Sequence, residues 1–240
     1  EEYTRCPSDI STLRSIYVSG SILNDKLYEF VHNVFKNIPI YNVYGLSEAG
    51  PRVTAQKSNC CKSNSVGKPI KGVEIAVVDQ NGKEVEKLQK GIIHVNTPSR
   101  FNGYILGNEK LKSLYKDWIN TGDIGFINKY GELKIVNRTD DLIIIDSHKI
   151  YPSEIENIVS KYDNIQDCVV FKSNENILCC VFELKSFENF HIDLLIKHCK
   201  KFLGLYELPK KWINLKSIPR TLNNKISREN IKILINNKGD

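Results

Sequence analysis

Hydrophobic and polar residues follow two different spacings in the first part of the chain. Residues 13–18 form a β-branched and aromatic run that ends at a Ser-Gly-Ser turn, which predicts a strand. Apolar residues then recur at helical spacing, with Asn24 or Asp25 as the expected N-cap. They are Leu23, Leu27, Phe30, Val31 and Val34. A second strand is expected over residues 39–44, so the order strand, helix, strand predicts a parallel α/β unit.

The pattern changes between residues 66 and 136, where short β-branched runs alternate with turn residues. Asp79-Gln80-Asn81-Gly82 is a hairpin-type turn, and a similar turn follows at residues 128–131. Strands are expected over residues 73–78, 91–95, 124–127 and 132–136. This texture predicts an antiparallel β section.

A separate small α+β unit is expected after Asp140. Strands are predicted over residues 168–171, 177–182 and 212–215, and helices over residues 153–159, 192–202 and 227–235. Pro152 is expected in the first turn of the first helix, with Ser153 as its cap, and Ser227 is expected to cap the last helix. The predicted class is therefore α/β: residues 1–139 (1–65 the α/β unit, 66–139 the β section) form part of a large domain, and residues 140–240 form a small domain.

Charge and composition exclude several functional classes. The net charge of +6 is spread along the chain rather than clustered, which disfavours nucleic-acid binding and suits an anionic nucleotide substrate. The longest apolar run, residues 142–145, is too short to span a membrane. Seven cysteines without C-x-x-C spacing, and no signal peptide, predict a reduced chain in the cytoplasm. The chain lacks Met, which suggests that it begins within a larger protein.

Four segments carry candidate chemistry. Residues 42–48 end a strand with an aromatic ring, a hydroxyl and a carboxylate, which suit a base, a phosphate and Mg²⁺. Thr121-Gly122-Asp123 offers a carboxylate for ribose hydroxyls, or simply an Asx turn. Residues 137–141 place an Arg beside two acids, as a joint or as a surface ion pair. Residues 218–228 present Lys225 on a turn, where it could also be an ordinary exposed lysine.

The order of these four segments resembles the adenylate-forming superfamily, which comprises acyl-CoA and aryl-CoA ligases, adenylation domains of peptide synthetases, and luciferases. The family shows Tyr-Gly-x-Thr/Ser-Glu, then Thr-Gly-Asp, then Gly-Arg-x-Asp-Asp with a downstream Glu-Ile-Glu, and then Pro-Arg-Thr-x-x-Gly-Lys-x-x-Arg. The matching segments here are Tyr44 to Glu48, Thr121 to Asp123, Arg138 to Glu156, and Pro219 to Arg228. The resemblance covers nearly the whole chain.

The resemblance implies a role for each matching residue. Tyr44 would stack on adenine, with Asn42 nearby and Gly45 providing the turn. Asp123 and Arg138 would contact the ribose, and Asp140 would be the hinge of a mobile C-terminal domain. The remaining implied residues are Gly20, Ser21 and Ile22 on the other face of the adenine, Ser47 at the phosphate, Glu48 at Mg²⁺, and Lys225 at the α-phosphate and substrate carboxylate.

The resemblance also implies the reaction. The enzyme would use ATP and Mg²⁺ to convert a carboxylic acid into an acyl-adenylate. It would then transfer the acyl group to CoA, or to the phosphopantetheine of an acyl or peptidyl carrier protein. Amino-acid adenylation for peptide synthesis is an alternative within the family.

Three positions depart from the family pattern. Asn137 and Asn224 stand where glycines precede the arginine and the lysine, and Asn tolerates the same backbone. Ser147 replaces a glycine that lets the pantetheine arm pass, which bears on the thioester step.

The family's upstream phosphate loop has no match in this chain. A non-catalytic half-protein is therefore the alternative from another functional class. Such a chain would bind an N-terminal half or a carrier protein.

Overall fold

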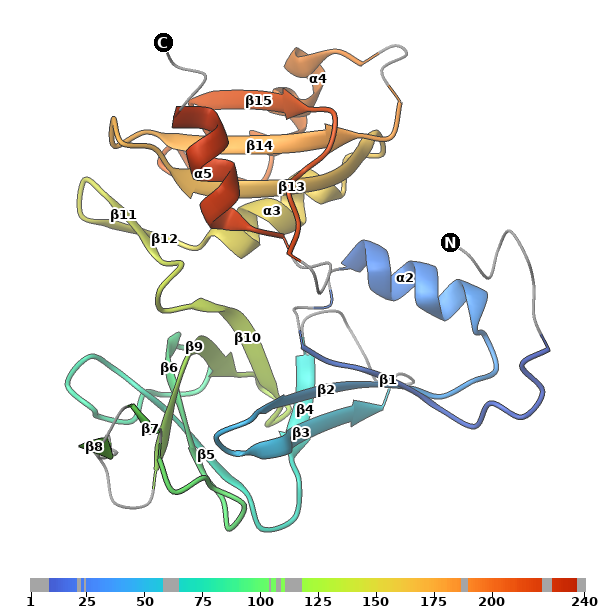
Figure 1. Cartoon of the computed structure of the whole chain (residues 1–240), viewed down its shortest axis with the longest axis vertical. Helices are drawn as coiled ribbons and strands as arrows, with labels where there is room; N and C mark the ends of the chain where they lie inside the picture. The colour runs from blue at the N-terminus through green and yellow to red at the C-terminus, as the bar shows by residue number, and fades with distance from the viewer. Residues whose placement is uncertain are drawn as a thin grey trace. The chain divides into compact units, whose positions relative to one another are not determined.

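The computed structural model describes residues 9–20, 23, 25–57, 65–103, 105–106, 109–110, 118–186, 190–221 and 226–236. The chain divides into two compact units, residues 1–140 (unit 1) and 141–240 (unit 2), each with its own elements (Figure 1). Of the helices in the described ranges, none combines the length and hydrophobicity that a membrane span requires.

Unit 1 opens with the predicted strand, helix and strand. β1 (Ile16–Val18) pairs in parallel with β2 (Ile40–Leu46), and α2 (Asp25–Val34) connects them. The parallel α/β unit is therefore confirmed. Asp25 lies inside the helix rather than before it, and Asn24 lies outside the described residues.

Six further strands extend this sheet by antiparallel pairing, in the order β1-β2-β3-β4-β10-β9-β6-β5. They are β3 (Gly50–Lys57), β4 (Ser65–Pro69), β5 (Glu74–Val78), β6 (Gly91–Asn96), β9 (Ile119–Ile127) and β10 (Leu133–Arg138); the short strands β7 (Ile105–Leu106) and β8 (Glu109–Lys110) form a separate pair. The antiparallel section is as predicted, whereas the sequence predicted neither β3 nor β4. The hydrophobic core of this unit is a cluster of buried residues from six strands and one turn: Ala49, Val53, Val66, Val77, Ile93, Val95, Ile119 and Leu133.

Unit 2 is a three-stranded sheet with helices on both faces. β13 (Ile165–Lys172) is one of the two edge strands and lies beside β14 (Leu178–Leu184), which pairs in parallel with β15 (Lys211–Leu215). Alternate strand residues pack against α3 (Pro152–Ser160) and α4 (Ile192–Cys199) on one face and against α5 (Arg228–Asn236) on the other. A two-stranded hairpin, β11 (Ile143–Ile145) and β12 (His148–Ile150), precedes this sheet.

The helix boundaries in unit 2 correct two predictions. Pro152 is the first residue of α3, so Tyr151 and not Ser153 is the N-cap residue. α4 ends at Cys199 rather than at residue 202, and a tighter turn follows, in which the N–H groups of Lys201 and Phe202 bond the carbonyls of His198 and Cys199. Ser227 caps α5 as predicted, since its hydroxyl accepts the Asn230 N–H at 3.3 Å.

Candidate functional site

Tyr44 stands near the end of β2, immediately before a point where two backbones almost touch. A Cβ atom on Gly45 would lie 2.4 Å from the Pro51 carbonyl oxygen of β3, so only glycine allows this approach. The β2–β3 register shifts between Tyr44 and Leu46, at the same point. The glycine of the Tyr-Gly pair therefore has a structural reason, which is to bring β3 against the strand that carries the tyrosine.

Asp123 lies inside β9, where a local irregularity sets its direction. Gly122 adopts a positive φ of 70°, and its N–H bonds the Asn120 side-chain oxygen at 2.9 Å. The Thr121 hydroxyl accepts the Asp123 N–H at 3.1 Å and donates to the Ile93 carbonyl. Thr-Gly-Asp is thus a kinked piece of strand whose side-chain bonds hold the carboxylate in one place.

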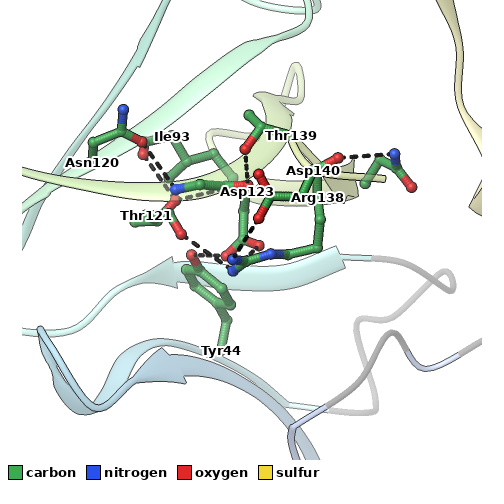
Figure 2. Close-up of polar contacts among 10 residues, drawn as sticks. Tyr44, Ile93, Asn120, Thr121, Asp123, Arg138, Thr139 and Asp140 are labelled. Atoms are coloured by element: carbon green, nitrogen blue, oxygen red, sulfur yellow. Dashed lines mark hydrogen bonds and ion pairs between the residues drawn. The ribbon is translucent and has the colours of Figure 1, made fainter. Parts of the chain in front are cut away.

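Tyr44, Asp123 and Arg138 form one hydrogen-bonded cluster, which Figure 2 shows. The Tyr44 hydroxyl donates to Asp123 Oδ2 at 2.6 Å, and Arg138 Nη1 lies 3.1 Å from Asp123 Oδ1. The same Nη1 donates to the Thr121 carbonyl at 3.3 Å. Three segments that were singled out separately in the sequence therefore meet at one carboxylate.

Burial and charge define what this cluster can do. Asp123 is 8% exposed, whereas the Arg138 side chain is 52% exposed. Burial, and then the neighbouring Asp123 charge, raises the pKa of the Tyr44 hydroxyl, which therefore stays protonated and donates. Each carboxylate oxygen can accept a second hydrogen bond, so Asp123 retains capacity for two hydroxyl donors.

Arg138 also marks the end of unit 1. Its Nη2 lies 3.9 Å from Asp140 Oδ2, and Asp140 is the last residue of the unit, with its side chain 86% exposed. The Thr139 N–H and hydroxyl both donate to the Gly122 carbonyl, at 2.8 and 2.9 Å. The strand that leaves unit 1 is therefore tied to the Thr-Gly-Asp segment by two consecutive residues, Arg138 and Thr139.

The remaining predicted residues have separate surroundings. Asn42 is buried and donates to the Ser65 carbonyl at 2.8 Å, which joins β2 to the start of β4. Glu48 is half-buried, and its carbonyl accepts the Phe101 N–H at 2.9 Å; Ser47 is exposed, and Gly20 has φ 87°. Ser21, Ile22 and Lys225 lie outside the described residues.

The hairpin β11–β12 has an unusual turn. Asp146 and Ser147 both have positive φ, of 48° and 66°, in a two-residue turn that normally favours glycine or asparagine. His148 follows and stacks on Tyr206, with ring centroids 3.6 Å apart, while its Nδ1 contacts the Asp146 carbonyl. Ser147 thus keeps the glycine-like backbone while adding a side chain.

One polar network was missed at the sequence level. Arg228, Glu156 and Asp141 form ion pairs within unit 2. Both Arg228 and Glu156 lie in segments that carried the resemblance, and their charge complementarity was the available signal.

Comparison with known proteins gives a consistent result. The model of a family described as "AMP-binding enzyme" matches residues 2–105. A 2-succinylbenzoate–CoA ligase from a Geobacillus species is 27% identical over 84% of this chain and 42% of the relative. A long-chain-fatty-acid–CoA ligase from Yersinia pestis is 28% identical over 97% of this chain and 42% of its own length. The chain thus spans less than half the length of these relatives.

Solved structures give the same picture of the fold. An o-succinylbenzoate CoA synthetase from Bacillus subtilis, in complex with its acyl-adenylate intermediate, matches with a TM-score of 0.83 and 24% identity. The match covers 96% of this chain and 48% of that one. An amide bond synthetase from Marinactinospora thermotolerans matches with a TM-score of 0.85 and 21% identity over 95% of this chain and 48% of that chain.

Proposed function

We propose that this chain is part of an adenylate-forming enzyme and carries part of the nucleotide site of an acid–thiol ligase, which its similarity to AMP-binding enzymes supports. The ligase activates a carboxylic acid with ATP as an acyl-adenylate, which releases pyrophosphate, and transfers the acyl group to a thiol, which releases AMP. The observation that carries this proposal is the cluster of Tyr44, Asp123 and Arg138, in which three separate sequence motifs converge on one buried carboxylate.

The cluster fits the nucleoside part of ATP. Asp123 accepts hydrogen bonds from the two ribose hydroxyls, and Arg138, half-exposed beside it, contacts the ribose from the other side. Tyr44 offers its ring to the adenine while its hydroxyl fixes Asp123. Asn42 would line the base together with Gly20, Ser21 and Ile22.

Residues next to this cluster in the sequence are proposed to bind the phosphates and the metal ion. Ser47 would contact phosphate, and Glu48 would hold Mg²⁺, a hard ion that binds through one or two carboxylates together with phosphate oxygens. Attack of a carboxylate on the α-phosphate joins two anions, so positive charge is needed where they meet. Mg²⁺ would supply part of this charge when bound, and Lys225 would supply the rest at the α-phosphate and the substrate carboxylate.

The second step uses the boundary between the units. We assign Asp140 as the hinge about which residues 140–240 turn after adenylation, so that Lys225 withdraws and the thiol can approach. The exposed side chain of Asp140, at the last residue of unit 1, supports this role. Ser147, with its strained backbone, lies on the hairpin expected near the arriving thiol.

The names of the relatives support a substrate class. Their printed names include an aryl acid, 2-succinylbenzoate, and long-chain fatty acids, both joined to CoA. We therefore propose an acyl or aryl acid with CoA as acceptor, ahead of a carrier protein or an amino-acid substrate. The buried free thiols of Cys168, Cys179, Cys180 and Cys199 support a reducing compartment such as the cytoplasm.

Calorimetry tests the nucleotide site directly. Asp123→Asn keeps the shape of the side chain but removes its charge, and Asp163→Asn, an exposed change in unit 2, is the matched control. Charge-assisted hydrogen bonds are worth about 1.5–3 kcal/mol, so Asp123→Asn should weaken ATP binding in the presence of Mg²⁺ about tenfold or more. The control should bind as the wild type does.

Two outcomes contradict the proposal. Equal affinity of wild type and Asp123→Asn would remove the ribose role. Absence of ATP binding by the wild-type chain would favour the other candidate function, a half-protein that binds a complementary N-terminal half. The observation that keeps this candidate open is that the chain spans less than half the length of its relatives.

A further inference from the structure

The chain segments on either side of residues 222–225 are held together at their base. Arg220 and Ile226 form an antiparallel bridge, and the Ser227 N–H donates to the Pro219 carbonyl at 2.9 Å. Ile226 also packs against the hydrophobic cluster beneath α5. Both ends of the segment therefore have fixed positions on unit 2.

Arg228, the first residue of α5, contacts three separate parts of unit 2. Its Nη1 donates to the Val170 carbonyl at 2.8 Å, and its Nη2 lies 2.8 and 3.1 Å from the two carboxylate oxygens of Glu156. Its Nε lies 3.7 Å from Asp141 Oδ1. The side chains of Arg228 and Glu156 are 28% and 19% exposed, so this pair is screened by water less than a surface ion pair.

Glu156 and Arg228 together bond the backbone N–H and carbonyl of Val170 in β13. Glu156 Oε1 accepts the Val170 N–H at 2.8 Å, while Arg228 bonds the carbonyl of the same residue. Burial raises the pKa of the Glu156 carboxyl, and Arg228 and the Val170 N–H oppose that rise. Removing the arginine would leave a buried carboxylate with one partner fewer, which is strongly unfavourable.

This network joins the start of unit 2 to the paired base of residues 222–225. Asp141 is the first residue of unit 2 and adjoins Asp140, the proposed hinge. Arg228 lies one residue beyond the paired base at Ser227. On the other side of that base, Arg220 forms an ion pair with Asp167, which belongs to the same strand as Val170. Both sides of residues 222–225 are therefore anchored to β13 by an arginine.

We propose that Arg228 is a positioning residue. It couples Asp141, at the start of unit 2, to the paired base that flanks residues 222–225, the segment that includes Lys225. By fixing Asp141 and Ser227 against β13, it makes both move as one body when the chain turns at Asp140. This proposal rests on the proposed function, in which Lys225 must reach the nucleotide. Arginine is required because its planar fork reaches three acceptors at once, whereas a lysine offers a single point charge.

Hydrogen exchange measured by mass spectrometry on this chain tests the coupling. Arg228→Lys should speed amide exchange about tenfold in residues 141–145 and 217–221, because the bonds to Asp141 and one bond to β13 are lost. Amides of β14 should be unchanged. Glu229→Gln, an exposed change in the same helical turn, is the control and should match the wild type.

Two exchange results would overturn the proposal. Unchanged exchange in residues 141–145 would show that Arg228 does not hold the hinge side. Faster exchange throughout unit 2, including β14, would show that Arg228 only stabilises the fold.

A kinetic comparison in the full enzyme separates this proposal from the proposed function. Arg228→Lys should lower kcat for acid-dependent pyrophosphate exchange about tenfold to a hundredfold, with KM for ATP unchanged, because a misplaced catalytic group affects the transition state more than binding. A rise in KM with unchanged kcat would refute the positioning role. Full activity of Lys225→Ala would instead refute the proposed function, while the exchange data would still decide whether Arg228 couples the two segments.

Discussion

Replacing Tyr44 by Phe removes one hydroxyl from the cluster of Tyr44, Asp123 and Arg138. The lost bond is a 2.6 Å hydrogen bond to a buried carboxylate. Hydrogen bonds to charged groups are worth about 1.5–3 kcal/mol. Asp123 keeps its ion pair with Arg138, so the lower end of this range, about 1.5 kcal/mol of unfolding free energy at pH 7, is expected.

The same variant should show a characteristic dependence on pH. The pKa of Tyr44 is raised in the folded state by burial and by the Asp123 charge. The stability that this hydroxyl contributes is therefore fully present below the unfolded pKa of about 10 and is lost as pH rises toward the folded value. The loss is about 1.4 kcal/mol per pH unit, so the difference between wild type and Tyr44→Phe should nearly vanish by about pH 11.

Urea unfolding followed by tryptophan fluorescence measures this difference. The chain has two tryptophans, Trp118 in unit 1 and Trp212 in unit 2, so a Trp212→Phe background reports on unit 1 alone. Tyr130→Phe removes an exposed hydroxyl and should stay within about 0.5 kcal/mol of wild type at pH 7. A Tyr44→Phe difference that is absent at pH 7, or constant from pH 7 to pH 11, would refute the reasoning.

Two further predictions follow from the packing. Gly45→Ala should lower the unfolding free energy of unit 1 by about 1–3 kcal/mol, because the new Cβ would overlap the Pro51 carbonyl. Gly204→Ala, whose new Cβ would meet only a flexible side chain, is the control. Equal stability of the two variants in urea would contradict the argument. Burial raises the pKa of four thiols, so iodoacetamide at pH 8 should label them only after unfolding. Labelling of the native chain, detected by peptide mass spectrometry, would show that the thiols are accessible. These thiols belong to Cys168, Cys179, Cys180 and Cys199.

The sequence predicted elements better than it predicted their contacts. The first α/β unit followed from β-branched runs and helical spacing, and Ser227 was a correct cap. β3 was missed because Gly50–Lys57 has few apolar residues and does not alternate clearly. The helix cap at Ser153 was wrong because Pro152 itself occupies the first helical position.

The candidate site depended on long-range pairing that local patterns do not encode. Tyr44 and Asp123 are 79 residues apart and belong to different parts of one sheet. Their motifs suggested a common ligand only through the family resemblance. The network around Arg228 was missed for the same reason: the opposite charges of Arg228 and Glu156 can be read from the sequence, but the two residues are 72 positions apart.

The ion pair on the outer side of β13 has a consequence for how unit 2 behaves in a crowded solution. An edge strand with unpaired backbone groups invites strand addition from another chain, and native proteins protect such edges. At Val170 both the donor and the acceptor are already engaged by Glu156 and Arg228. A change that opens this pair would therefore expose a site for intermolecular β-pairing and favour aggregation.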